Sequence, residues 1–139
     1  MVAVLIDTGI LIAIYSPPDQ NYRRAVELVD EVMDGVHGQA YLTDYVLAEV
    51  LNYVVAKSRI DRKADSIAKD LLGESGEPWL EFKWIDEETW RHGRERFRAY
   101  SRARLSFTDC TSLAFIERNR LDAMVSFDSG FDGIVPRIH

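Results

Sequence analysis

The order of apolar and polar residues predicts a chain in which strands and helices alternate. Residues 2–6 form an unbroken apolar run rich in β-branched side chains, which is typical of a strand buried on both faces of a parallel sheet. Runs with helical spacing of apolar residues predict helices over residues 10–15, 21–36, 45–58, 61–72, 86–103 and 108–119. Further strands are predicted over residues 39–43, 79–85, 122–127 and 134–135.

Local signals mark where some of these elements begin. Gly9 is expected to permit a sharp turn after the first strand. Thr43 or Asp44 is expected to cap the helix that follows, with Asp44 favoured, while Asp61 and Asp86 begin the next two. Strands separated by helices predict a three-layer α/β/α sandwich with a central, mainly parallel sheet. The length of 139 residues suits a single domain covering residues 1–139.

Composition excludes several classes of protein. The single cysteine, Cys110, rules out an intrachain disulfide and the usual cysteine-based zinc site, and predicts a small buried apolar residue in a reducing compartment. The apolar run at the N-terminus lacks a basic flank and is followed by Asp7, so it predicts neither a signal peptide nor a membrane span. We therefore expect a soluble, cytoplasmic protein with no membrane partner.

Four acidic residues stand where side chains of a parallel sheet converge. Asp7 ends the first strand, Asp128 follows the strand over residues 122–127, Asp109 opens a helix, and Glu49 lies on a largely apolar helix face. Each has a structural alternative: a helix cap for Asp7, a polar turn for Asp128, a capping box with Ser106 for Asp109, and a buried ion pair with an arginine for Glu49. Their shared placement at one sheet edge favours a common site.

Carboxylates gathered in this way repel one another unless cations lie between them. An all-oxygen site favours Mg²⁺ or Mn²⁺ over zinc, and no histidine is well placed to compete as a ligand. Two such ions can activate a water molecule and stabilise the leaving oxygen of a phosphodiester.

The pattern resembles the PIN domain family, and the length and layout resemble its VapC-type toxin ribonucleases. The resemblance rests on residues 4–9, on Glu49 within residues 46–50, on residues 105–109 with the helix that they open, and on residues 126–131. It implies an endoribonuclease that needs Mg²⁺ or Mn²⁺, forms a homodimer and is inhibited by a cognate antitoxin. Asp7, Glu49, Asp109 and Asp128 would form the metal site, with Thr8 and Ser126 as hydroxyls that orient the carboxylates. Ser126 stands where the family usually has threonine.

A cluster of acids cannot attract RNA, and the net charge of −6 also argues against non-specific binding. Arginines are concentrated between Arg91 and Arg104. On the helix over residues 86–103, a core-facing stripe is predicted at Trp90, Gly93, Phe97 and Tyr100, and a basic ridge beside it at Arg91, Arg94, Arg98 and Arg102. We expect Arg98, Arg102 and Arg104 to contact substrate phosphates or an acidic antitoxin segment, the alternative being a solvated face balanced by nearby glutamates.

Two other classes of function compete with a nuclease. An aspartyl phosphatase also begins with a strand and an aspartate, but it needs a second acid two residues on, where this chain has Gly9. A catalytically silent module that binds RNA or protein is the stronger alternative, and metal-dependent RNA cleavage separates it from an active enzyme.

Overall fold

The computed structural model describes residues 3–60 and 62–139 and is built around a five-stranded sheet whose strand pairs are all parallel. The strands are β1 (Ala3–Ile6), β2 (Gln39–Thr43), β3 (Glu81–Lys83), β4 (Ala123–Val125) and β5 (Arg137–Ile138). Their order in the sheet is β3-β2-β1-β4-β5, so β1 is central. The carboxyl ends of all five strands consequently lie along one edge of the sheet.

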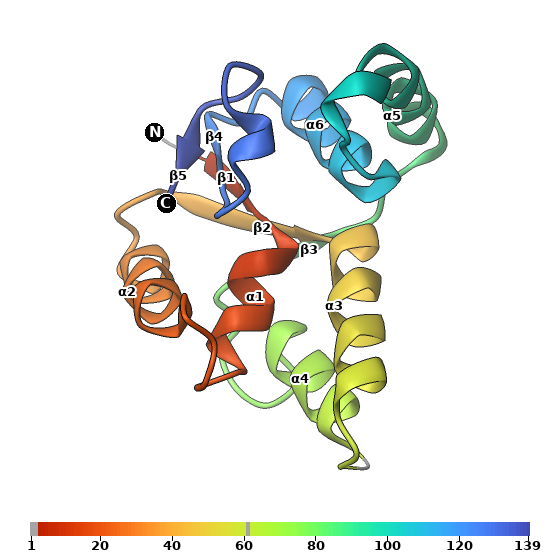
Figure 1. Cartoon of the computed structure of the whole chain (residues 1–139). Helices are drawn as coiled ribbons and strands as arrows, with labels where there is room; N and C mark the ends of the chain where they lie inside the picture. Colours follow the sequence, from red (N-terminus) through yellow and green to blue (C-terminus); the bar gives the residue numbers. More distant parts are fainter. Residues whose placement is uncertain (1–2, 61) are drawn as a thin grey trace.

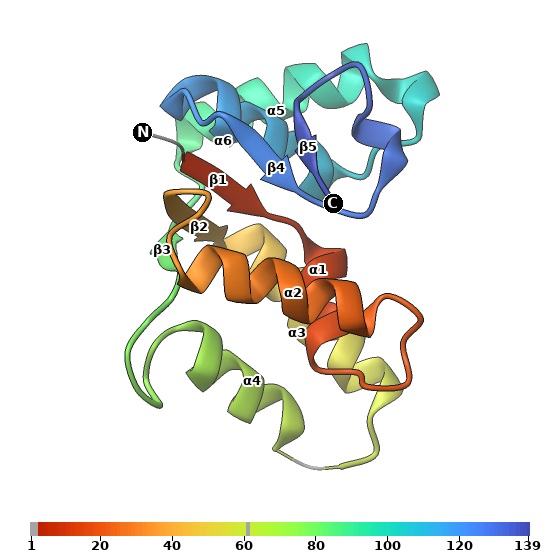
Figure 2. The same ribbon diagram turned by 90° about the vertical axis from the view of Figure 1, so that its left-hand side faces the viewer.

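Helices cover both faces of this sheet (Figures 1 and 2). One face carries α1 (Thr8–Ile14), α2 (Tyr22–Met33), α3 (Asp44–Lys57) and α4 (Lys63–Leu71). The other carries α5 (Glu87–Ala99) and α6 (Phe107–Asn119). Two short 3₁₀ turns, η1 (Ser101–Ala103) and η2 (Ser129–Phe131), follow α5 and β4. The predicted three-layer α/β/α architecture is confirmed.

The central strand β1 supplies both apolar cores, as its unbroken apolar sequence predicts. Val4 and Ile6 pack into the core beneath α1 to α4, whereas Leu5 packs into the core beneath α6. All three side chains are fully buried. Alternate residues of one strand thus face opposite helical layers.

The last strand lies later than predicted. It comprises Arg137–Ile138, not residues 134–135. The backbone N–H groups of Ile134 and Val135 both donate to the carbonyl of Phe131, which makes this segment a turn after η2. The side chains of Ile134 and Val135 pack against the core beneath α6, so their apolar character reflects packing and not strand pairing.

Several helix ends differ from the prediction. Helix α2 ends at Met33 because Gly35 adopts a left-handed conformation (φ +77°) and its N–H donates back to the carbonyl of Val32. Helix α5 ends at Ala99, and η1 with a left-handed Arg104 (φ +58°) replaces its predicted last turn. The predicted start at Asp61 and the predicted strand position Val2 lie outside the described residues.

Two predictions about the beginnings of helices are wrong. Thr43, not Asp44, caps α3, since the Thr43 hydroxyl accepts from the backbone N–H of Val46. Asp44 instead accepts from the backbone N–H of Ile85 at 2.7 Å and ties α3 to the segment after β3. Gly9 lies inside α1, and a Cβ there would meet no atom within 4 Å, so no turn requires glycine at this position. Within residues 3–60 and 62–139, no helix is long and apolar enough to cross a membrane.

Candidate metal centre

Asp7 is the buried centre of the site. It follows β1, and its backbone N–H donates to the carbonyl of Val125 on β4. One carboxylate oxygen caps α1 by accepting from the N–H of Thr8 at 2.9 Å. The other accepts from the hydroxyl of Ser126 at 2.6 Å. The helix-cap alternative is therefore real, but it uses only one of the two oxygens, and the second reaches across the sheet edge to the end of β4.

The surroundings of Asp7 disfavour its charged form. Burial raises the pKa of Asp7 from its ordinary 3.8 to about 6, opposed by the hydrogen bond from Ser126. The negative charges of Asp109 and Asp128 raise this pKa further. A carboxylate that is both buried and repelled by two others is the situation that a bound cation relieves.

Asp109 opens α6 and forms the predicted capping box. Its carboxylate accepts from the N–H of Ser106 at 2.9 Å, and its own N–H donates to the Ser106 hydroxyl at 3.0 Å. Burial raises the pKa of Asp109, and the charges of Glu49 and Asp128 add to the effect. The capping role and the electrostatic coupling to other acids therefore coexist, because Ser106 engages only one carboxylate oxygen.

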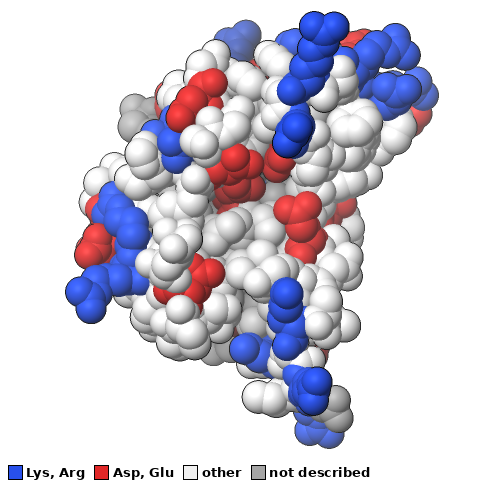
Figure 3. Space-filling view, in the orientation of Figure 1, with Lys and Arg blue, Asp and Glu red and all other residues white. Residues whose placement is uncertain are grey.

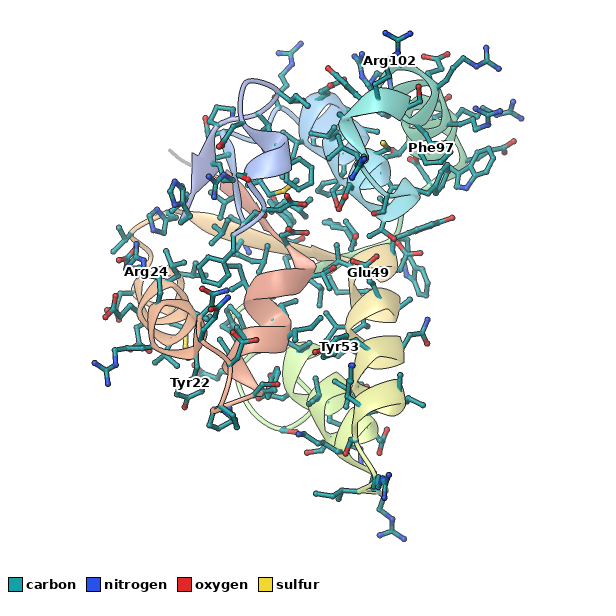
Figure 4. The ribbon with its side chains drawn as sticks, in the orientation of Figure 1. Tyr22, Arg24, Glu49, Tyr53, Phe97 and Arg102 are labelled. Atoms are coloured by element: carbon teal, nitrogen blue, oxygen red, sulfur yellow. The ribbon has the colours of Figure 1, made fainter. Side chains whose placement is uncertain are left out.

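Asp128 and Glu49 complete the group from two further elements. Asp128 caps η2 through Gly130 at 2.8 Å, and its backbone N–H donates to the Ser126 hydroxyl at 3.0 Å. Glu49 is half-buried in the second turn of α3 (Figure 4). Among the described residues no cation lies within ion-pair distance of Glu49, so the alternative of a buried salt bridge gains no support there.

The four predicted acids are thus electrostatically coupled at one sheet edge, and Figure 3 shows acidic side chains in a hollow between the α5–α6 layer and α3. As placed, no three acidic, histidine or cysteine side chains within residues 3–60 and 62–139 are close enough to hold one ion. Asp7, Asp109 and Asp128 each turn one oxygen towards a backbone N–H. Asp109 and Asp128 each keep a second oxygen outside these bonds.

The donor set fits a hard divalent ion. Its groups are carboxylate and hydroxyl oxygens, which Mg²⁺ and Mn²⁺ prefer. The buried hydroxyl of Thr8 lies beside Asp7 and has no hydrogen-bond partner among the described residues, as a group kept for a ligand or water would. The hydroxyl of Ser126 donates to the carboxylate of Asp7 and accepts from the backbone N–H of Asp128.

The predicted basic ridge of Arg91, Arg94, Arg98 and Arg102 is interrupted where α5 ends at Ala99. Arg91 pairs with Glu87 and Arg96 with Glu117, whereas Arg98, Arg102 and Arg104 are exposed and lack an ion pair within the described chain. Because α5 ends at Ala99, Arg102 lies on η1, off the predicted helical stripe. Figure 4 shows Arg102 at the outer end of the α5–α6 layer, apart from Glu49.

The predicted core-facing stripe of α5 is only partly correct. Gly93 is buried against Thr111 of α6, but Trp90 and Phe97 are each 41% exposed. Their rings pack against Phe107 at the start of α6, with centroids 5.5 Å apart in both pairs. The ring of Tyr45 on α3 also packs against Phe107, with ring centroids 6.1 Å apart. These aromatic residues therefore join α3, α5 and α6 beside the acids.

Arg137 on β5 was not predicted from the sequence. Its guanidinium bonds the carboxylate of Asp132 and the carbonyl of Ser126. The bond with Asp132 and the charge of Asp132 raise the pKa of Arg137, and the charge of Asp128 adds to the effect. The signal available in the sequence was an arginine within a short apolar terminal segment, five residues after an aspartate.

A separate hollow of about 640 Å³ lies away from the acids, between the end of α1 and α4, and includes Tyr15, Lys63 and Ile67 in its lining.

Known proteins resemble this chain over nearly its whole length. The family model described as PIN domain matches residues 4–135. A VapC ribonuclease of Archaeoglobus fulgidus is 32% identical over 131 residues, which cover 93% of this chain and 79% of the relative. The structure of Mycobacterium tuberculosis VapC20, described as a toxin that cleaves the sarcin-ricin loop, has a TM-score of 0.75 at 16% identity and covers 93% of this chain and 91% of that one. A toxin-antitoxin complex from Klebsiella pneumoniae has a TM-score of 0.64 at 18% identity, covering 98% and 96%.

Proposed function

The chain belongs to the PIN domain family, and on this premise we propose that it is an endoribonuclease that uses Mg²⁺ or Mn²⁺ held by Asp7, Glu49, Asp109 and Asp128. The observation that carries the proposal is the state of Asp7. This carboxylate is buried, has its pKa raised to about 6, and is coupled to Asp109 and Asp128. Such repulsion at one sheet edge is a poor way to stabilise a fold and a good way to bind a divalent cation.

Some residues of the site would bind the metal, and others would orient the residues that bind it. The four carboxylates would hold the metal, and Ser126 would fix Asp7 and the backbone at Asp128 relative to one another. The hydroxyl of Thr8 lies beside Asp7 and is free to orient it or a bound water. When bound, Mg²⁺ or Mn²⁺ supplies an activated water and neutralises charge on the phosphodiester oxygens.

The substrate would be held by exposed arginines on and just after α5. We assign Arg98, Arg102 and Arg104 to phosphate contacts because they are exposed and lack an acidic partner within the described chain. The same residues could instead receive an acidic segment of an antitoxin, since the relatives include a VapC ribonuclease and a toxin-antitoxin complex. Activity on RNA would be exerted in the cytoplasm.

Homodimerisation belongs to the same proposal. Large apolar side chains are exposed on and just before α5, where Trp84 is 74% exposed and Trp90 and Phe97 are each 41% exposed. Exposed large apolar side chains of this kind are typical of an interaction surface, and a second copy of the chain would cover them. Light scattering coupled to size-exclusion chromatography measures the oligomeric state directly.

The decisive experiment is cleavage of a mixed RNA pool by the purified chain with EDTA, Mg²⁺ or Mn²⁺. We expect cleavage only with metal, and a rise in melting temperature when metal is added, because a ligand of the native state stabilises it. Asp7→Asn should abolish both effects. Asp34→Asn, which changes an exposed aspartate after α2, serves as the matched control and should change neither.

The alternative is a catalytically silent module that binds RNA or protein. It predicts RNA binding without cleavage in every metal condition and an unchanged melting temperature on metal addition. Those results for the wild type, with the fold intact, would reject the nuclease proposal.

A further inference from the structure

Arg137 is an enclosed arginine on the edge strand of the sheet. Its side chain is only 9% exposed. Nε and Nη2 donate to the two carboxylate oxygens of Asp132, at 2.8 and 3.1 Å, and Nη1 donates to the carbonyl of Ser126 at 3.0 Å. The forked pair with Asp132 fixes the plane of the guanidinium, so the third bond has a defined direction.

The bond to Ser126 connects Arg137 to the acidic site. The backbone of Ser126 is held twice from β5, because its N–H also donates to the carbonyl of Ile138 at 3.0 Å. The Ser126 hydroxyl donates to Asp7 at 2.6 Å and accepts from the N–H of Asp128 at 3.0 Å. Through these bonds, Ser126 links β5 to two of the four acids.

The pair with Asp132 also closes the loop that carries Asp128. Asp132 ends η2, two residues after Gly130, whose N–H donates to the carboxylate of Asp128. The segment from Asp128 to Arg137 is thereby fixed at its beginning by Ser126 and closed by the Asp132–Arg137 pair.

We infer that Arg137 is a positioning residue for the proposed metal centre, which it orders by fixing Ser126 and the loop that carries Asp128. The inference rests on the proposed function, since it concerns the geometry of the same carboxylates. A positioning role and a simple effect of charge predict opposite changes in divalent-ion binding. A cation near acidic ligands weakens divalent-ion binding by repulsion, so removing it for charge reasons alone would strengthen binding. Loss of positioning would weaken binding.

The test is the affinity of the full chain for Mn²⁺, measured by titration calorimetry and by the electron paramagnetic resonance signal of free Mn²⁺. Arg137→Lys keeps the charge but cannot form the fork, and we expect it to lower Mn²⁺ affinity by roughly tenfold, the usual effect of losing a group that orients a ligand. Arg137→Gln should lower affinity by at least as much. Circular dichroism verifies the fold of each variant. If Arg137→Gln does not fold, Arg137→Lys alone tests the inference.

Arg24→Gln is the matched control. Arg24 also bonds the C-terminal segment, donating to the carbonyl of His139 at 3.1 Å, but its other partners are Glu27 and Glu31 and not the site. We expect this variant to bind Mn²⁺ as the wild type does. Unchanged or tighter binding by folded Arg137 variants would overturn the inference while leaving the proposed function intact. Absence of Asp7-dependent Mn²⁺ binding in the wild type would overturn the proposed function, and the inference with it.

Discussion

At the scale of the single residue, Asp7 makes the stability of the metal-free protein depend on pH. Its folded pKa of about 6 lies above the ordinary 3.8, so folding favours the protonated form. The favourable contribution is complete below pH 3.8 and is lost as the pH rises through about 6. Asp7→Asn should therefore raise the free energy of unfolding at pH 7.5 by up to about 3 kcal/mol and by little at pH 4.

Urea unfolding in EDTA between pH 4 and 7.5 measures this difference. Asp34→Asn is again the control, because Asp34 is exposed and its substitution should shift stability little at any pH. If Asp7→Asn raised the free energy of unfolding equally at all pH values, the charge of Asp7 would not be the cause of the gain.

Glu49 gives a second prediction at this scale. If it binds metal, Glu49→Gln should leave the free energy of unfolding within about 0.5 kcal/mol and abolish RNA cleavage. If it were half of a buried salt bridge, the same change would cost about 3–5 kcal/mol. A urea melt and a cleavage assay on the same preparation distinguish the two, and a large loss of stability would speak against the metal role.

Some residues of the candidate site could be predicted from the sequence, and others could not. Asp7 and Asp128 could be placed because strand ends share an edge, and Asp109 because its spacing from Ser106 marks a helix start. Arg137 could not, since its role depends on a bond to the carbonyl of Ser126, and backbone carbonyls carry no sequence signal.

At the scale of the element, the packing of α5 on α6 depends on Gly93. A Cβ at this position would lie 3.2 Å from Cα and 3.3 Å from Cγ2 of Thr111, so the two helices would have to move apart by a few tenths of an ångström. We expect Gly93→Ala to lower the free energy of unfolding by about 1–3 kcal/mol. Gly9→Ala is the matched helical control, since it meets no atom within 4 Å and should be neutral or slightly stabilising. Urea melts of both variants measure this, and equal stabilities would contradict the close approach.

The arginines after α5 can be tested as a group by the salt dependence of RNA binding. In an Asp109→Asn background, removing one arginine that binds a phosphate should reduce the slope of log affinity against log salt by roughly 0.7 for single strands. We expect this reduction for Arg102→Ala and Arg104→Ala. Arg91→Ala is the control because Arg91 already pairs with Glu87. Equal slopes in all variants would mean that these arginines form a solvated face and that RNA is held elsewhere.

Elements with a long periodic pattern were predicted well, and short ones near turns were not. Helix α6 and strand β2 agree with the pattern to within a residue. Helix α5 was predicted too long because η1 continues its composition, and β5 was displaced because Ile134 and Val135 are apolar for packing. Periodicity records burial, and two residues of strand are too few to distinguish pairing from packing.

At the scale of the whole molecule, the sheet order explains why acids from distant segments meet. Strands β1 and β4 are neighbours, so Asp7 and Ser126 lie side by side although 119 residues separate them. Helices α3 and α6 pack against each other, which couples Glu49 to Asp109. A parallel sheet could be predicted from the alternation of elements, but the order β3-β2-β1-β4-β5 required the structure, because strand order leaves no trace in local periodicity.

The rate at which the buried thiol of Cys110 is labelled can report how often this chain opens locally. Its side chain is fully buried against the core beneath α6, and burial together with the charge of Asp109 raises the pKa of its thiol to about 11. Such a thiol does not react with an aromatic disulfide reagent until α6 lifts from the sheet. Labelling kinetics in the native state therefore report how often the layer carrying Asp109 opens. We expect saturating Mn²⁺ to slow labelling of the wild type and to leave the rate of Asp109→Asn unchanged. Labelling of the wild type at one rate with and without Mn²⁺ would show that metal does not hold this layer closed.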